Sequence, residues 1–502
     1  MELRPWRFTA RSTAVRLFAT CWAIYMLHSA TNIVREHYLA FAIGDHLSFR
    51  VDEYRGLHPD LFETFGRGWH INNNPGVSMM AALPYAAARP MIDRIARRVQ
   101  TARAAAGVTD PPVYDTPWPN ARAFHAEAWR RGLDVRLGLG AMAIQAGFMA
   151  PVSALAVAGM FLVLRKVFAS DRLALWLALL FAFGTPVFFR TGFLNHNLLV
   201  GYAGGGGFVA LALASPPGAN RFALAGLGGG LAVLLDYTGV VMAACLLGYG
   251  LVRLVGDGRA REWRRFVLWY GAGAAGPIAL LWFYQWASFG DPFAPAQRWM
   301  PDVAWADAGY RGLSWPMADL LLANLVDYRY GLFTSAPLLL LSLAAPWVDR
   351  GRLLPRREMW CLLAIFAAFW LFCGGVNYGR LQFNTAIRYM TSMLPFLFLL
   401  SAVVLVRLPR AAIAAVVAIS VTLAWSLAMY RDVEVGYGVL EPVLQVVRGG
   451  PTLPVLTTVS RLGGRTGELA GSGATLVLLV VCASTLLYAI WRRSLEPSRV
   501  GQ

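Results

Sequence analysis

Apolar runs of about 17–25 residues recur along the whole chain, which is the length that crosses the hydrocarbon core of a bilayer. Hydrophobic residues make up 57% of the 502 residues, more than is typical of soluble domains. The runs predict an all-α, polytopic integral membrane protein with about twelve transmembrane helices. The predicted spans cover approximately residues 14–34, 139–164, 173–189, 197–214, 222–236, 238–252, 266–288, 332–348, 359–373, 391–406, 411–429 and 473–490.

Basic residues between these runs predict how the helices are oriented. The N-terminal segment carries Arg4, Arg7, Arg11 and Arg16, and the turn after the second span carries Arg165 and Lys166. Because cytoplasmic loops are enriched in arginine and lysine, both termini are predicted in the cytoplasm of a bacterial cytoplasmic (inner) membrane. The net charge of +17 then follows from topology, so it does not indicate a nucleic-acid partner.

The largest polar feature is a first extracytoplasmic loop, predicted over residues 35–136. The chain accordingly divides into a transmembrane domain with this loop (1–430), followed by an extracytoplasmic segment with the last helix (431–502). Within the loop, residues 75–90 are apolar enough to be a further span, which would give thirteen helices. The segment is short and contains Pro84, and arginines follow it, so a helix lying in the membrane interface is the preferred interpretation.

Glu36 is the first candidate for chemistry because it follows directly on the first apolar run. A carboxylate so close to lipid is costly unless it is paired or functional. Its neighbour Arg35 is either its partner or an interface anchor. Asp45 and Asp52, further along the loop, are the competing catalytic carboxylates.

Four other polar or aromatic residues are candidates for binding a sugar or an acceptor. Tyr38 offers an aromatic face, and Asn74 ends a run of three asparagines before Pro75, where a helix cap is the simpler interpretation. His196 stands where an apolar span begins, so that capping and ligand contact are both open. Asp236 lies within apolar sequence, which favours a paired or functional carboxylate.

Three arginines at predicted outer ends of spans are candidates for binding a phosphate: Arg190, Arg380 and Arg388. For each of them an interface anchor is the alternative. The chain has no Walker P-loop, HExxH or GxSxG motif, so ATP-driven transport is unsupported. The five cysteines lie in apolar runs without metal-type spacing, and neither a metal nor a cofactor is expected.

Spaced fragments over the first ten predicted helices carry a family resemblance. They are Arg35-Glu36-His37-Tyr38, Gly44-Asp45, Asn74-Pro75-Gly76, Gly184-Thr185-Pro186, His196, Leu235-Asp236-Tyr237, Tyr330-Gly331-Leu332-Phe333, Tyr378-Gly379-Arg380 and Arg388-Tyr389. In plan and in these fragments the chain resembles the GT-C superfamily of membrane glycosyltransferases, including its protein mannosyltransferase and lipid A aminoarabinose transferase branches. The acidic pair that these enzymes carry after helix 1 is absent, so Glu36 takes its place or Asp45 or Asp52 reaches in.

The resemblance implies an inverting transfer of a sugar from a polyprenyl-phosphate donor to a cell-envelope glycan, lipid or protein, among membrane lipids. A carboxylate would deprotonate the acceptor hydroxyl, arginine would bind the departing phosphate, and the donor tail would lie in a groove between helices. No metal is required for this chemistry. A flippase or transporter of lipid-linked sugars, and an oligosaccharide polymerase or ligase, are the alternatives.

Overall fold

The computed structural model describes residues 10–30, 32–114, 118–213, 216–303, 309–380, 386–462 and 464–495. Over these residues the chain is almost entirely helical, with one two-stranded antiparallel sheet. The all-α prediction is therefore confirmed. Arg4 and Arg7, which entered the prediction of orientation, lie outside the described residues.

Six of the described helical segments are long and apolar enough to cross a membrane. The first joins α5 (Asp134–Ile144), a π-helical turn η2 (Gln145–Met149) and α6 (Ala150–Phe168) into one continuous helix. The others are α11 (Gly239–Gly256), η3 (Ala260–Glu262) with α12 (Trp263–Phe289), α16 (Arg356–Gly374), α18 (Arg410–Met429) and α22 (Gly473–Leu495). This is the pattern of a multi-pass membrane protein.

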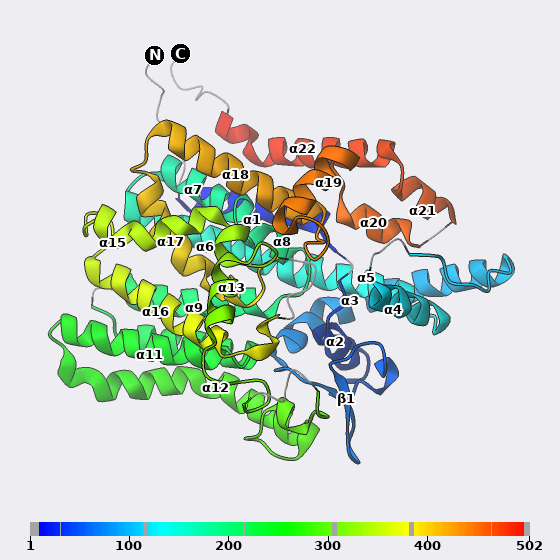
Figure 1. The fold of residues 1–502 in the computed structure, drawn as a ribbon, viewed down its shortest axis with the longest axis horizontal. Coiled ribbons are helices and arrows are strands. Elements are labelled where there is room, and N and C mark those ends of the chain that lie inside the picture. The colour runs from blue at the N-terminus through cyan, green and yellow to red at the C-terminus, as the bar shows by residue number, and fades with distance from the viewer. Residues whose placement is uncertain are drawn as a thin grey trace.

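The remaining predicted spans are also helical in the structure, but they are shorter or less apolar. They are α1 (Ala10–Leu27), α7 (Asp171–Phe183), α9 (His196–Ala212), α10 (Ala219–Leu235), α14 (Leu332–Ser335) with η6 (Pro337–Ala344) and α15 (Ala345–Val348), and η8 (Tyr389–Met393) with α17 (Leu394–Leu405). In Figure 1 the long helices run nearly parallel to the horizontal axis. Length and composition alone thus identify six spans of the predicted twelve.

Two predicted boundaries are corrected by the structure. Helix α1 ends at Leu27 instead of Val34. Beyond this end, Ala30 N–H donates to Gly192 O at 2.7 Å, which is a partner outside the helix, while His28 Nδ1 contacts Ile24 O in the last turn of α1. The span after the loop begins at Asp134 instead of about Leu139. The connector 28–34 carries the chain from α1 to the first helix of the loop.

The loop folds as a unit, here called the loop unit, made of the described parts of residues 35–130. It contains α2 (Arg35–His46), η1 (Asp52–Tyr54), strands β1 (Leu61–Thr64) and β2 (Gly68–Ile71), α3 (Gly76–Ala105) and α4 (Pro119–Arg130). Figure 1 shows α2, α3, α4 and β1 gathered on the right-hand side of the view, below α22. The loop unit therefore covers one end of the helical bundle.

The segment 75–90 forms part of the single 30-residue helix α3, which packs against α2 and α5. Pro84 does not interrupt it. The helix also carries exposed Arg94, Arg97 and Arg98, and it is not among the helices apolar enough to span a membrane. The described geometry therefore favours the interface helix over a thirteenth span.

The C-terminal segment forms short helices before the last long one: η9 (Gly438–Leu440), α19 (Glu441–Gly449), α20 (Pro454–Ser460) and α21 (Gly464–Ala470). Helix α19 packs on α18, and α20 contacts α1. Four further elements complete the described helices: α8 (Val187–Thr191), η4 (Ala296–Trp299), α13 (Ala318–Val326) and η7 (Asn377–Arg380), the last of which contacts α13.

Candidate active site

The first turn of α2 places Glu36 at the junction of the loop unit and the helical bundle. Val34 precedes the helix in an extended conformation, and its N–H donates to His37 Nδ1 at 3.1 Å. Ser78 on α3 donates to Glu36 O at 2.9 Å, which ties the two helices together. The Glu36 side chain is only 2% exposed, so its carboxylate must find its partners inside the protein.

Three groups converge on one oxygen of this carboxylate. Asn73 Nδ2 donates to Glu36 Oε1 at 2.7 Å, His196 Nδ1 lies 3.1 Å away, and Arg35 Nε lies 3.3 Å away. Burial by itself raises the pKa of Glu36, but Arg35, His196 and Asn73 together outweigh burial and hold that pKa well below its usual value. Glu36 is therefore ionised at neutral pH.

His196 links this carboxylate to a second one. Asn195, and not His196, caps α9, because its side chain accepts from Leu198 N at 3.0 Å. The imidazole is thus free of a capping role, and its Nε2 lies 3.4 Å from Asp236 Oδ2. Asp236 follows α10 directly and accepts from Thr238 N at 2.9 Å. Glu36, His196 and Asp236 form a buried chain of three titratable groups from three separate elements.

The asparagine run contributes through a residue that the sequence interpretation did not single out. Asn73 contacts Glu36, whereas Asn74 Nδ2 donates to Val233 O on α10. No side chain caps the start of α3, so the interpretation of Asn74 as a helix cap is wrong. Gly76 lets α3 begin this close to α10, because a Cβ there would lie 2.6 Å from Leu234 O. A three-asparagine run was the signal that could have pointed to Asn73.

Asp45 lies at the other end of α2, nine residues and therefore about 14 Å from Glu36 along the helix. Its carboxylate is bound by Arg89 Nε at 2.9 Å, by Arg136 and by the Tyr85 hydroxyl at 3.1 Å. Asp52 pairs with Arg50 at 2.8 Å and accepts the Trp69 N–H at 2.8 Å. The structure brings neither competitor into contact with Glu36.

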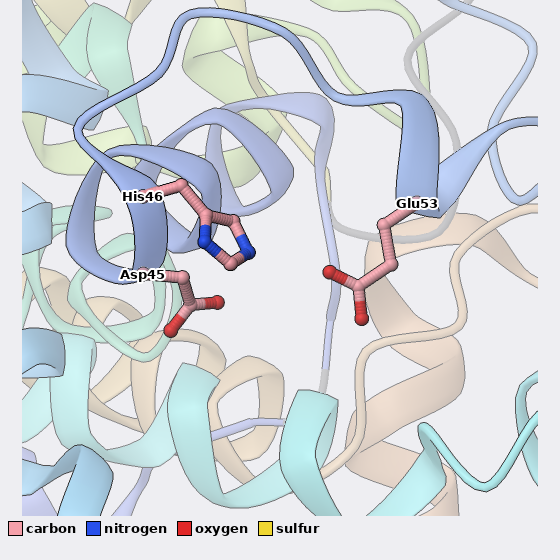
Figure 2. Close-up of side chains that lie close together, drawn as sticks. All are labelled: Asp45, His46 and Glu53. Carbon is pink, nitrogen blue, oxygen red and sulfur yellow. The ribbon is translucent and has the colours of Figure 1, made fainter.

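Asp45, His46 and Glu53 are near enough to one another for their ligand atoms to lie within 4.8 Å, and Figure 2 shows Glu53 facing the other two. Arg136 lies between the two carboxylates and pairs with both, at 3.2 Å from Glu53 Oε1. This guanidinium supplies the positive charge that the acidic pair requires. We therefore interpret these carboxylates and Arg136 as an ion-pair network at the loop unit.

The three candidate arginines occupy different environments. Arg388 precedes η8, with its guanidinium carbon 5.0 Å from the Tyr389 ring centroid. Arg190 is 1% exposed and donates to the carbonyls of Ala386, at 2.8 Å, and Ile387. It thereby holds the backbone that leads into Arg388. Arg380 is half-exposed and pairs with Asp319 at 2.6 Å.

Asp60 is a further carboxylate of this cluster, which it joins through Arg35, and the sequence interpretation did not single it out. Arg35 pairs with Asp60 as well as with Glu36. Burial raises the pKa of Asp60, but Arg35, His58 and Arg388 outweigh burial and lower it overall. Arg35 and Arg388 therefore both act on Asp60. Nothing in the sequence around Asp60 distinguishes it from the other loop carboxylates.

Tyr38 lies two residues after Glu36, about half a turn along α2, and its ring packs within the loop unit. It is fully buried, with its ring centroid 5.1 Å from that of Tyr54 and 6.3 Å from that of His58. Its hydroxyl has no hydrogen-bond partner among the described residues. Of the four predicted sugar or acceptor residues, His196 and Asp236 join Glu36, whereas Asn74 bonds to α10 and Tyr38 packs against Tyr54.

Comparisons with known proteins leave this geometry as the main guide to function. No family model matches the chain, and neither the curated proteins nor the solved structures give a match.

Proposed function

We propose that this protein is an inverting glycosyltransferase that moves a sugar from a polyprenyl-phosphate donor to an acceptor of the cell envelope. The observation that carries the proposal is the cluster beside Glu36: a buried, ionised carboxylate next to Arg35, with Arg388 near enough to act on Asp60. An acceptor hydroxyl needs a base, and a departing lipid phosphate needs positive charge. Glu36 would supply the base, and Arg35 and Arg388 would supply the positive charge.

Glu36 acts as the general base in this mechanism. Its contacts with Asn73, Arg35 and His196 all involve Oε1, so Oε2 is the oxygen that takes the acceptor proton. The acceptor O–H bond breaks, its oxygen bonds to the anomeric carbon, and the bond from that carbon to the phosphate oxygen breaks. The low pKa of Glu36 keeps it ready to accept a proton but limits its strength as a base.

Arg388 is assigned to the donor phosphate, since planar guanidinium groups bind phosphate through two parallel hydrogen bonds. Arg190 acts through backbone, because it holds the carbonyls of Ala386 and Ile387 that precede Arg388. Arg380 is assigned no part in donor binding, because Asp319 occupies its guanidinium. Of the three arginines, Arg388 is thus proposed to bind the donor phosphate directly, and Arg190 is proposed to position it.

An apolar cavity supports a lipid-linked donor. It has a volume of about 180 Å³ and lies between α6, α7, α9, α16 and α17. Helix α9 leads from His196 to Gly205 and Gly206 in its wall, and the chain after Arg388 leads to Pro395 and Phe396 in the same wall. A hydrocarbon tail fits such lining, and its phosphate would then face the Arg388 end of these elements.

The position of the charged groups favours an enzyme over a flippase or transporter. Glu36 lies in the first turn of α2, His196 opens α9, and Asp236 follows α10. Transporter sites are typically formed near the bilayer midplane by broken spans, whereas these groups meet at helix ends beneath the loop unit. In this proposal the loop unit lies outside a bacterial inner membrane, and both termini are cytoplasmic.

Transfer is tested with purified protein in liposomes, a panel of polyprenyl-phosphate sugars labelled in the sugar, and an envelope extract as acceptor. We expect label to pass from the lipid to the extract and Glu36→Gln to abolish that passage. The Arg380→Lys variant is the control, because Arg380 is outside the cluster. Label that crosses the bilayer while still attached to its lipid would establish the flippase instead, and label that never moves with any donor would refute the transferase.

A further inference from the structure

The contacts of His196 indicate how many protons Glu36, His196 and Asp236 hold between them. Its Nδ1 faces Glu36 Oε1 at 3.1 Å, and its Nε2 faces Asp236 Oδ2 at 3.4 Å. A neutral imidazole carries one N–H and one lone pair. With both carboxylates ionised, the neutral ring would point that lone pair at a negative oxygen. Two attractive contacts therefore require one proton more than the neutral ring holds.

The charges around this chain favour the same count. Glu36, Asp60 and Asp236 are the acidic groups of the cluster, and Arg35 and Arg388 are its arginines. A positively charged His196 makes three positive groups against three negative ones. Buried charges are tolerated when they are paired, so a neutral total is the stable arrangement. A neutral ring would leave one uncompensated negative charge.

The other titratable groups that act on this chain do not supply the proton. His37 and His58 act on Glu36, and burial lowers the pKa of both. Cys373, Tyr378 and Tyr389 act on Asp236 from α16, η7 and η8, and side chains of these types are ordinarily uncharged at pH 7. The amide nitrogen Nδ2 of Asn197 lies 3.0 Å from His196 Nε2, and Asn197 Oδ1 has no hydrogen-bond partner among the described residues. Because amide oxygen and nitrogen are assigned from the hydrogen-bond network, Asn197 Oδ1 can face a protonated Nε2.

We propose that His196 is held as an imidazolium between Glu36 and Asp236 and that the three residues form a proton relay for the transfer reaction. The proton relay rests on the proposed function, whereas the charged state of His196 in the protein without substrate does not. Glu36 Oε2 takes the acceptor proton, and the Nε2 proton of His196 passes to Asp236. The chain ends as two carboxylic acids and a neutral ring with Nδ1–H, having gained one proton in total. Asp236 is thereby a proton-accepting partner that never touches the substrate.

The resting state is tested without any substrate by nitrogen-15 NMR of histidine-labelled protein in lipid nanodiscs at pH 7. The chain has seven histidines, and the signal lost in His196→Gln identifies this one. We expect both ring nitrogens of His196 to carry protons in the unaltered protein. Asp236→Asn should leave a neutral ring protonated at Nδ1 only, and Glu36→Gln should leave one protonated at Nε2 only. Asp52→Asn is the matched control and should change neither nitrogen.

A neutral His196 ring in the unaltered protein would overturn the proposal, as would a ring that stays charged in Asp236→Asn. The relay is tested by the pH dependence of turnover with the donor that the liposome assay identifies: Asp236→Asn should lower turnover and displace its pH profile while donor affinity is retained. Lowered turnover with an unchanged profile would show that Asp236 acts only by packing. If the NMR result is as expected and no donor is turned over, the proposed transferase function is refuted, whereas the charged state of His196 is supported.

Discussion

Asp45→Asn should loosen the loop unit without touching Glu36. The Asp45 side chain is 0% exposed, and it compensates Arg89, which is 36% exposed, and Arg136, which is 18% exposed. Removing one partner of a buried ion pair typically costs about 3–5 kcal/mol. Because both arginines can partly reach water, we expect the lower end, about 3 kcal/mol. Asp52 is 41% exposed, so Asp52→Asn should cost roughly 1 kcal/mol or less for its ion pair.

Hydrogen–deuterium exchange of the intact protein in nanodiscs measures this difference locally. A loss of about 3 kcal/mol corresponds to exchange about 10²-fold faster wherever the amides of α2 and α3 exchange by opening of this unit. Peptides from α11 and α18 should be unchanged, which controls for general damage. Equal protection in Asp45→Asn and unaltered protein would refute the structural role of the network. If Asp45→Asn kept full protection yet lost turnover, Asp45 would become the catalytic carboxylate.

Three further outcomes are expected. Glu36→Gln should lower turnover by about 10²–10⁴-fold, the usual loss for a general base, while polyprenyl phosphate still binds in native mass spectrometry; full turnover would contradict the assignment. Arg388→Lys should weaken binding of polyprenyl phosphate, with Arg380→Lys as the unaffected control, and equal binding by both would remove Arg388 from the donor site. Burial lowers the pKa of His37 to about 4 from 6.5, so His37 contributes stability above about pH 6.5 that is lost as the pH falls towards 4. His37→Gln should flatten that decline in exchange protection of α2, and an unaltered pH dependence would refute it.

The helical pattern could be predicted from the sequence because the length and apolar character of each helix are properties of its own residues. Helix ends could be predicted less well, since they depend on partners elsewhere. Helix α1 ends at Leu27 instead of Val34, and just beyond this end Ala30 bonds to Gly192, more than 160 residues later. The predicted Asn74 cap failed for a similar reason: the side chain is drawn to α10. Local sequence does not contain these competing partners.

The candidate site could be predicted residue by residue but not as an arrangement. Glu36, His196 and Asp236 each stood out as a polar group in or beside apolar sequence, where burial needs compensation. Their mutual contacts depend on how α2, α9 and α10 meet. Asp60 could not be singled out, because it becomes distinctive only when Arg35 reaches it. The sequence therefore identified polar residues whose burial costs free energy, and tertiary packing determined which of them share a site.

Asp45 and Glu36 show why burial alone does not identify a reactive carboxylate. Both belong to α2 and both are buried, and both lie beside arginine. Asp45 uses both oxygens: Oδ1 contacts Arg89, and Oδ2 contacts Arg136. The Glu36 contacts with Asn73, Arg35 and His196 gather on Oε1. A carboxylate bound through both oxygens is held in place, whereas the contacts of Glu36 orient its carboxylate through one oxygen. Because a general base needs an oriented oxygen, the asymmetry of these contacts favours Glu36 over Asp45 as the proposed base within this helix.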